Sequence, residues 1–174
     1  MKIAAISGSL RAGSSNTAVL RAAARLAPAG VEVVLFEGIA DLPFFNPDLD
    51  GDDVPAPVGA MRALIGNVDG LLISSPEYAR GVAGVLKNAL DWLVASETFA
   101  GKPTALINTS PRAFHAQASL REILSTMAAR LIPEAFVSIS LTGKAVTPDD
   151  VLADTVCTRR LSESLEALIA AIRG

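Results

Sequence analysis

This chain contains five short apolar runs that lack the polar and apolar alternation of a half-exposed strand. These runs limit the possible folds more strongly than any other feature of the sequence. Segments with helical periodicity separate most of them. A strand that is apolar along its whole length is usually covered on both faces, as in a parallel sheet with helices on each side. We therefore predict strands at Lys2–Ile6, Val31–Phe36, Gly70–Ser74, Thr104–Asn108 and Ala135–Ile139.

The segments between and after these runs carry apolar residues at helical spacing. Thr147 and Pro148 precede the last segment, an N-cap residue followed by a proline at the first helical position. Asp41–Pro57 is rich in Pro, Asp and Gly and predicts a long loop. Helices are predicted at Asn16–Leu26, Val58–Ile65, Val82–Val94, Ala116–Leu131 and Asp149–Ile172.

This alternation predicts an α/β fold, a three-layer sandwich around a five-stranded parallel sheet in the doubly wound order 2-1-3-4-5. A chain of 174 residues is expected to form one domain, residues 1–174. Ligands of such sheets bind beyond the carboxyl ends of the strands, near the switch point between strands 1 and 3. The loops that follow the first and third strands are therefore the first places to look for a site.

Charge and cysteine content narrow the function classes. With 15 Lys and Arg, 18 Asp and Glu and a net charge of −3, no nucleic-acid partner or anionic membrane surface is expected. No apolar run approaches the roughly 20 residues of a membrane span. One cysteine, Cys157, and one histidine, His115, allow no internal disulfide and no histidine-rich metal site. We expect a cytoplasmic protein without a metal.

The segment "GSLRAGSSN", Gly8–Asn16, joins the first strand to the first helix. Such a turn presents free backbone N–H groups and the positive end of the helix dipole, which suits an anion. The spacing of Gly8 and Gly13 matches a P-loop, but the lysine of that motif is missing, and the dinucleotide fingerprint is not matched. A terminal phosphate is favoured, with hydrogen-bond donors from Ser9, Arg11, Ser14, Ser15, Asn16 and Thr17.

A simpler alternative exists for part of this cluster. Ser14, Ser15 or Asn16 would be an ordinary N-cap of the first helix, and Arg11 would be solvated.

A second motif, "SSPEYARGVAGVLKNALDWL", follows the third predicted strand. Together with the first loop it resembles the NAD(P)H-dependent FMN reductases, a flavodoxin-like family that includes quinone, chromate and azo-dye reductases. The resemblance implies that the first loop surrounds the FMN phosphate. It also implies that Pro76, Glu77, Tyr78 and Ala79 run along the isoalloxazine, largely through backbone groups. The alternative is an ordinary turn with Tyr78 in solvent.

The sequence departs from the family pattern at three places. Ala79-Arg80-Gly81 stands where Asn-Gly-Ser is usual, Ala83 replaces a common proline, and the loop after the fourth strand lacks the usual glycines. In that loop Thr109 and Ser110 are predicted to reach the flavin edge. Arg112 and His115 are candidates to face the nicotinamide, its phosphates or an acceptor, although for His115 a surface position is favoured.

The helix predicted at Val82–Val94 has an apolar stripe that is typical of core, with Trp92 at its margin. In similar proteins this helix contributes to a dimer interface, and 51% of the chain is apolar, so a homodimer or homotetramer is expected. Cys157 is expected to be a small packing residue.

The resemblance predicts an enzyme that passes hydride from NADPH or NADH through FMN to a quinone, flavin, azo or other small-molecule electron acceptor. Because the flavin carries this chemistry, no catalytic side chain is predicted. One alternative is a flavodoxin-type electron carrier, which the near-neutral charge and Arg11 disfavour. The other is a phosphate-ester transferase or hydrolase, which the missing P-loop lysine disfavours.

Overall fold

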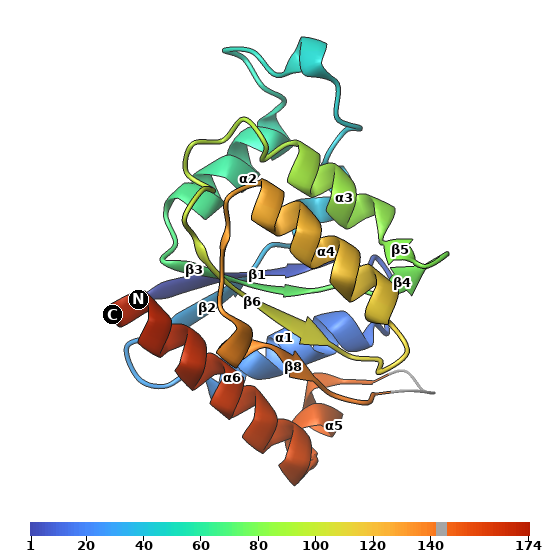
Figure 1. Cartoon of the computed structure of the whole chain (residues 1–174), viewed down its shortest axis with the longest axis vertical. Coiled ribbons are helices and arrows are strands. Elements are labelled where there is room, and N and C mark those ends of the chain that lie inside the picture. The colour runs from blue at the N-terminus through green and yellow to red at the C-terminus, as the bar shows by residue number, and fades with distance from the viewer. Residues whose placement is uncertain (142–145) are drawn as a thin grey trace.

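A parallel sheet runs through the centre of the molecule, with helices on both faces (Figure 1). The structure is a computed structural model that describes residues 1–141 and 146–174. Strands β1 (Lys2–Ser7), β2 (Glu32–Leu35), β3 (Gly70–Ser74) and β6 (Pro103–Asn108) pair in the order β2-β1-β3-β6. The predicted fold class and strand order are confirmed up to this fourth strand.

The fifth position of the sheet is filled by two short strands instead of the predicted Ala135–Ile139. β7 (Arg130–Leu131) pairs with the start of β6, and β8 (Val137–Ser138) pairs with its end. Because β3 occupies the other edge of β6, both short strands share its free edge. The 3-10 turn η3 (Pro133–Ala135) lies between them, and Pro133 has no N–H to donate to a ladder.

The continuous apolar runs are explained by burial on both faces. In β1, Ile3 and Ala5 pack into a core with α1 (Ser15–Leu26), α5 (Pro148–Ala153) and α6 (Thr155–Arg173). Ala4 and Ile6 face the opposite core. That second core is built with α2 (Ala56–Gly66), α3 (Gly84–Asp91) and α4 (Phe114–Thr126). The predicted three-layer sandwich is therefore correct.

Three predicted helices have different ends. The prediction Val82–Val94 begins too early and ends too late, since Val82 belongs to strand β5 and turns follow Asp91. The prediction Ala116–Leu131 runs too far because Ala128, with φ 58°, turns the chain back into β7. The prediction Asp149–Ile172 is two helices, α5 and α6. They separate at Asp154, whose carboxylate accepts hydrogen bonds from the N–H groups of Val156 and Cys157.

The predicted loop Asp41–Pro57 is anchored to α3 and contains the 3-10 turn η2 (Pro47–Leu49), while η1 (Gly38–Asp41) precedes it. Trp92 is fully buried, not marginal as predicted. Its Nε1 donates to the Pro43 carbonyl at 2.8 Å, and its ring meets Phe45 edge-on. Asn88 adds bonds to the same two residues. Trp92 therefore fixes this loop.

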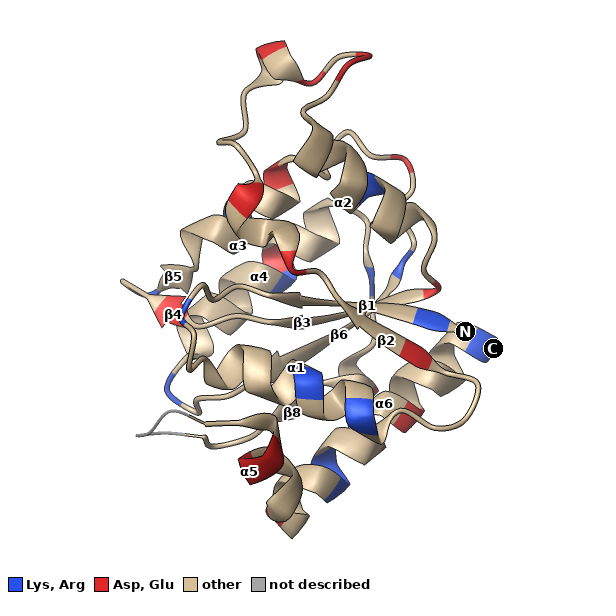
Figure 2. Ribbon diagram, turned by 180° about the vertical axis from the view of Figure 1, so that it is seen from behind, with Lys and Arg blue, Asp and Glu red and all other residues tan. Residues whose placement is uncertain are grey.

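Charged residues are scattered over the helices of both layers (Figure 2). Within residues 1–141 and 146–174, no helix combines the length and apolarity needed to cross a bilayer. Cys157 is buried in the α1–α6 core, as predicted. Burial, with the nearby Asp154 carboxylate, raises the pKa of its thiol.

Candidate functional site

Three loops meet beyond the carboxyl ends of β1, β3 and β6. They enclose a cavity of about 290 Å³ at the switch point where ligands of doubly wound sheets bind. Each loop contributes residues that were predicted to belong to a site. The lining includes Ser15 and Asn16 from the first loop, Pro76 and Glu77 from the second, and Thr109, Ser110 and Arg112 from the third.

Asn16 holds the three loops together. Its side chain is 4% exposed, and its Oδ1 accepts hydrogen bonds from Ser74 Oγ at 2.8 Å and Thr109 Oγ1 at 3.2 Å. Ser15 Oγ also lies 3.2 Å from Thr109 Oγ1. The start of α1 is thereby bonded to the ends of β3 and β6. Sequence reasoning placed Asn16 in the site but did not predict this joining role, which depends on partners 58 and 93 residues away.

The first loop passes very close to the second. The Gly8 N–H donates to the Ser74 carbonyl at 2.8 Å. A Cβ at Gly8 would lie 2.7 Å from Ser75 Oγ and 3.2 Å from Leu86 Cβ. Only glycine leaves room for this approach without movement of its neighbours.

The predicted phosphate cluster does not line a single cavity. Ser9, Arg11 and Thr17 line a neighbouring cavity of about 350 Å³. Ser14 is buried and caps α1, its Oγ accepting from the Thr17 N–H at 3.3 Å, which is the simpler role proposed for it. Arg11 is exposed. The loop thus presents donors on two sides of the helix N-terminus.

The second loop contains a hairpin that the sequence reasoning missed. β4 (Glu77–Tyr78) and β5 (Gly81–Val82) pair antiparallel across a two-residue turn. Both turn residues are left-handed, with φ 49° at Ala79 and φ 59° at Arg80. A two-residue hairpin turn with two positive φ angles favours Asn-Gly, so Ala-Arg gave no turn signal here. Each such residue stores about 1 kcal/mol or more of strain.

Two residues of this loop are not part of the cavity lining. Tyr78 is 60% exposed, and neither it nor Ala79 lines the 290 Å³ cavity. Their predicted place along a flavin remains a prediction.

Glu77 connects the hairpin to α4. Its Oε2 accepts a hydrogen bond from the Ala116 N–H at 2.9 Å. Ala113, at the N-cap position of α4, has no side chain able to cap, so Glu77 supplies the missing acceptor at the positive end of the helix. The sequence placed Glu77 near the site, but its partner is 39 residues away.

The third loop is ordered by Asn108 at the end of β6, whose Oδ1 accepts from the Ser110 N–H at 3.1 Å. Thr109 is buried beside Asn16, and Arg112 reaches the cavity wall. His115 does not line this cavity; its ring lies 4.0 Å from that of Phe114.

The chemistry offered by the three loops is hydrogen bonding to a ligand. Hydroxyl, amide, guanidinium and backbone N–H donors predominate, and the first loop has no acidic residue between Gly8 and Thr17. Across the residues that the structure describes, no group of three or more His, Cys, Asp or Glu is arranged to hold a metal ion. The donor set fits a phosphate-bearing ligand.

Residues 1–143 match the NADPH-dependent FMN reductase family, a segment that includes all three loops. The chain belongs to this family. It is 35% identical over 173 residues to an NAD(P)H-dependent FMN reductase of Pseudomonas aeruginosa, covering 97% of this chain and 93% of that protein. The predicted resemblance is confirmed.

Two further proteins support the assignment. A 2-hydroxy-1,4-benzoquinone reductase of a Burkholderia species is 38% identical over 162 residues, which cover 86% of this chain and 87% of that protein. Among solved structures, the flavoenzyme NAD(P)H:(acceptor) oxidoreductase FerB of Paracoccus denitrificans superimposes with a TM-score of 0.79. The two share 30% sequence identity, with 99% of this chain and 97% of that chain covered. The flavodoxin-like fold is thus shared with flavoenzyme reductases.

Proposed function

We propose that this protein is an FMN-dependent oxidoreductase that uses NADPH or NADH to reduce a quinone or another small-molecule acceptor. The proposal depends chiefly on one observation. Three loops in which neutral and cationic donors predominate, with Glu77 as the one carboxylate of the cavity lining, meet at the switch point of a chain that belongs to the FMN reductase family. Bound FMN supplies the hydride and electron transfer, so the protein needs no acid or base of its own.

The first loop is the proposed phosphate-binding segment. Its hydroxyls, its amide and the free N–H groups of α1 satisfy phosphate oxygens, and Arg11 supplies a positive charge. Arg11 makes no ion pair with any residue that the structure describes, so its guanidinium is available. The proposed phosphate-binding residues are Ser9, Arg11, Ser14, Ser15, Asn16 and Thr17.

The other two loops are the proposed contacts of the flavin ring. Pro76 to Ala79 flank it, with Pro76 setting the direction in which the chain leaves β3. Thr109 and Ser110 offer hydroxyls at the cavity wall, where donors stabilise the charge of a reduced ring. Arg112 lines the same cavity and is a candidate contact for the NADPH phosphates or the acceptor.

We further propose that the whole chain acts as one cytoplasmic domain that assembles into a homodimer or homotetramer. The apolar fraction of 51% and the exposed Phe44 and Val94 near α3 support an apolar interface. Light scattering coupled to gel filtration measures the assembly directly.

The deciding experiment is the visible spectrum of the purified protein, before and after anaerobic addition of NADPH. We expect a flavin spectrum that bleaches with NADPH and returns when benzoquinone is added. Continuous NADPH oxidation with benzoquinone alone would exclude the electron-carrier alternative. A colourless protein that takes up no FMN would overturn the proposal and favour a phosphate-ester enzyme.

The phosphate role is tested by Arg11→Ala, with Arg25→Ala as the matched control. Arg25 lies in the last turn of α1, at the opposite end of the helix from the loop, and pairs with Asp149 at 2.6 Å. A charged hydrogen bond contributes about 1.5–3 kcal/mol, so we expect FMN affinity to fall at least tenfold in Arg11→Ala only. Riboflavin, which lacks the phosphate, should bind both variants equally. Unchanged FMN affinity in Arg11→Ala would refute this role.

A further inference from the structure

A second cavity, of about 450 Å³, lies at the free edge of the sheet. It is bounded by α4, by β8 and by the first turns of α6. In Figure 1, α4 and α6 lie on either side of β8. Asn108 separates it from the candidate site, since this residue lines both cavities. The space exists because β8 is only two residues long and leaves the edge of β6 incompletely covered.

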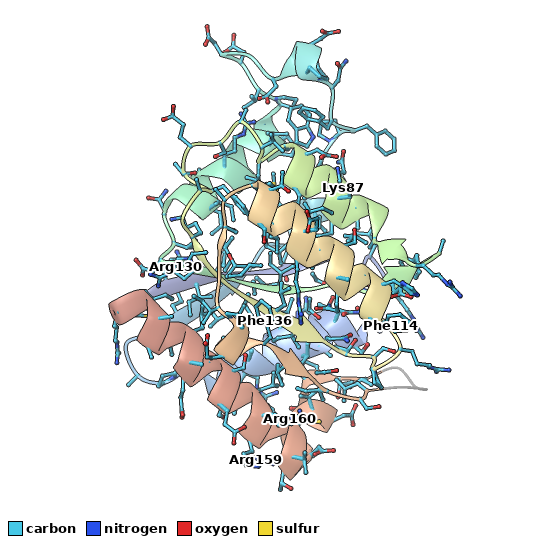
Figure 3. All side chains as sticks on the ribbon, viewed as in Figure 1. Lys87, Phe114, Arg130, Phe136, Arg159 and Arg160 are labelled. Carbon is cyan, nitrogen blue, oxygen red and sulfur yellow. The ribbon has the colours of Figure 1, made fainter. Side chains whose placement is uncertain are left out.

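The walls of this edge cavity combine polar and apolar residues in about equal measure, and two of the apolar residues are aromatic. Phe114 from α4 and Phe136 from the segment before β8 contribute rings, and Leu106 contributes its side chain from β6. Figure 3 shows Phe114 at the start of α4 and Phe136 between α4 and α6. The Arg121 guanidinium carbon lies 4.9 Å from the centre of the Phe136 ring. The two rings suit the flat apolar body of a small ligand, and Phe114, which is 62% exposed, has room for such a contact.

An unpartnered donor lies in the same wall. Gln117 is 8% exposed, and its Nε2 is the one buried side-chain nitrogen or oxygen in the described part of the chain that has no hydrogen-bond partner. An amide that is buried without a partner is costly and uncommon in folded proteins. A ligand oxygen in the cavity would satisfy it.

Two exposed arginines add positive charge to the same wall. Neither Arg121 nor Arg160 makes an ion pair with another described residue, although Arg160 Nη1 donates to the Ser138 carbonyl at 2.8 Å. Glu134 and Glu163 line a smaller cavity beside Arg160, yet neither pairs with it. By contrast, the adjacent Arg159 pairs with Glu163 at 2.9 Å.

We propose that the edge cavity binds a small organic carboxylate with a flat apolar body. The carboxylate pairs with the guanidinium groups of Arg121 and Arg160 and accepts from Gln117. The body packs against Phe114 and Phe136. A neutral ligand would leave both guanidinium charges unpaired, and a bare inorganic anion would leave the aromatic walls uncovered.

The test uses benzoate as the probe, with the isosteric neutral benzamide as its comparison. The FMN-loaded protein is titrated and followed by ¹H–¹⁵N NMR and calorimetry. We expect saturable benzoate binding that shifts the Gln117 side-chain amide and leaves the flavin absorbance unchanged. Benzamide should bind at least tenfold more weakly, because it carries no charge for the arginines.

Arginine variants identify the site. R121Q and R160Q should each weaken benzoate binding about tenfold, since each removes one charge-assisted contact. R159Q is the matched control. Arg159 is next to Arg160 in α6 but already pairs with Glu163, so this variant should bind benzoate as tightly as the unsubstituted chain does.

Three results would overturn the proposal. The first is the absence of saturable benzoate binding, and the second is equal binding of benzoate and benzamide. The third comes from sedimentation: if R121Q or R160Q dissociates an assembly while benzoate binding is unchanged, the arginines serve a contact between copies instead.

Discussion

The two loops that flank the candidate site are held in place in opposite ways. The first loop, Gly8–Asn16, is fixed by buried hydrogen bonds from Asn16 to Ser74 and Thr109. The β4–β5 hairpin has two left-handed residues at its tip and is bonded to α4 through Glu77. Many buried bonds make a segment rigid, whereas strain and exposure make local opening easier.

This difference suits the proposed function. A phosphate that stays bound throughout catalysis is best met by a loop that needs no rearrangement. An open ring face that receives first NADPH and then an acceptor benefits from a border that opens at lower cost. Substitutions in the two loops should therefore differ in their effects on stability and on FMN affinity.

The largest effect is expected at Asn16. Asn16→Leu removes the shared acceptor and leaves the hydroxyls of Ser74 and Thr109 without it in the core. Unsatisfied buried polar groups cost about 1–3 kcal/mol each, so we expect a loss of roughly 3 kcal/mol. Urea unfolding of the FMN-free protein measures this loss.

Asn16→Asp is the matched control for that substitution. It keeps an acceptor, so it should retain most of the stability, yet its negative charge beside the proposed phosphate should reduce FMN affinity. If Asn16→Leu unfolds at the same urea concentration as the unsubstituted chain, the first loop is not held in the way described here.

A smaller effect is expected at the contact between the hairpin and α4. Glu77→Ala leaves the Ala116 N–H without its acceptor, and loss of a helix cap costs about 1 kcal/mol. Glu77→Gln keeps an oxygen at the same position and should restore most of the loss. Hydrogen exchange of the Ala116 amide reports the contact directly. If the Ala116 amide is equally protected in Glu77→Ala and Glu77→Gln, this hydrogen bond does not hold the hairpin to α4.

The hairpin tip offers a stabilising change. Replacing Ala79 and Arg80 by Asn-Gly places the residues favoured by this turn at the two left-handed positions. Relief of the strain at two residues, partly offset by the larger entropy that glycine gives the unfolded chain, should raise the free energy of unfolding by about 1 kcal/mol. The opposite pair, Ala79→Val with Arg80→Val, should destabilise the protein. If the Asn-Gly variant lowers stability, the strain is not located at this turn.

The sequence predicted best the parts whose surroundings are uniform. β3 was predicted with its observed ends because every residue from Gly70 to Ser74 is buried, so the apolar run and the strand coincide. The fifth strand could not be predicted in the same way. Its two halves are defined by pairing with β6 and by Pro133 between them, not by their own pattern.

The same distinction holds within the candidate site. The position of the first loop followed from its place between a strand and a helix, and it is at the switch point as expected. The hairpin was missed because Ala79 and Arg80 adopt a turn that their side chains disfavour. The roles of Asn16 and Glu77 depend on partners from distant strands and helices, which only the folded chain brings together.

A helix cap remote from both loops provides the smallest expected effect and a reference for the others. The hydrogen bond from the Cys157 backbone N–H holds the pKa of Asp154 below its ordinary value. Desolvation opposes this effect, and the Val156 N–H adds a smaller lowering. The stabilising contribution of the Asp154 carboxylate is therefore complete above about pH 4 and is lost as the pH falls through the lowered pKa of the folded protein.

Asp154→Asn still caps α6 but does not titrate. Thermal unfolding should show a slight deficit of this variant at pH 7 that disappears in strong acid, while FMN affinity stays unchanged. If FMN affinity also falls, residues far from the two loops influence the site, and the contrast between the loops cannot be assigned to their own hydrogen bonds.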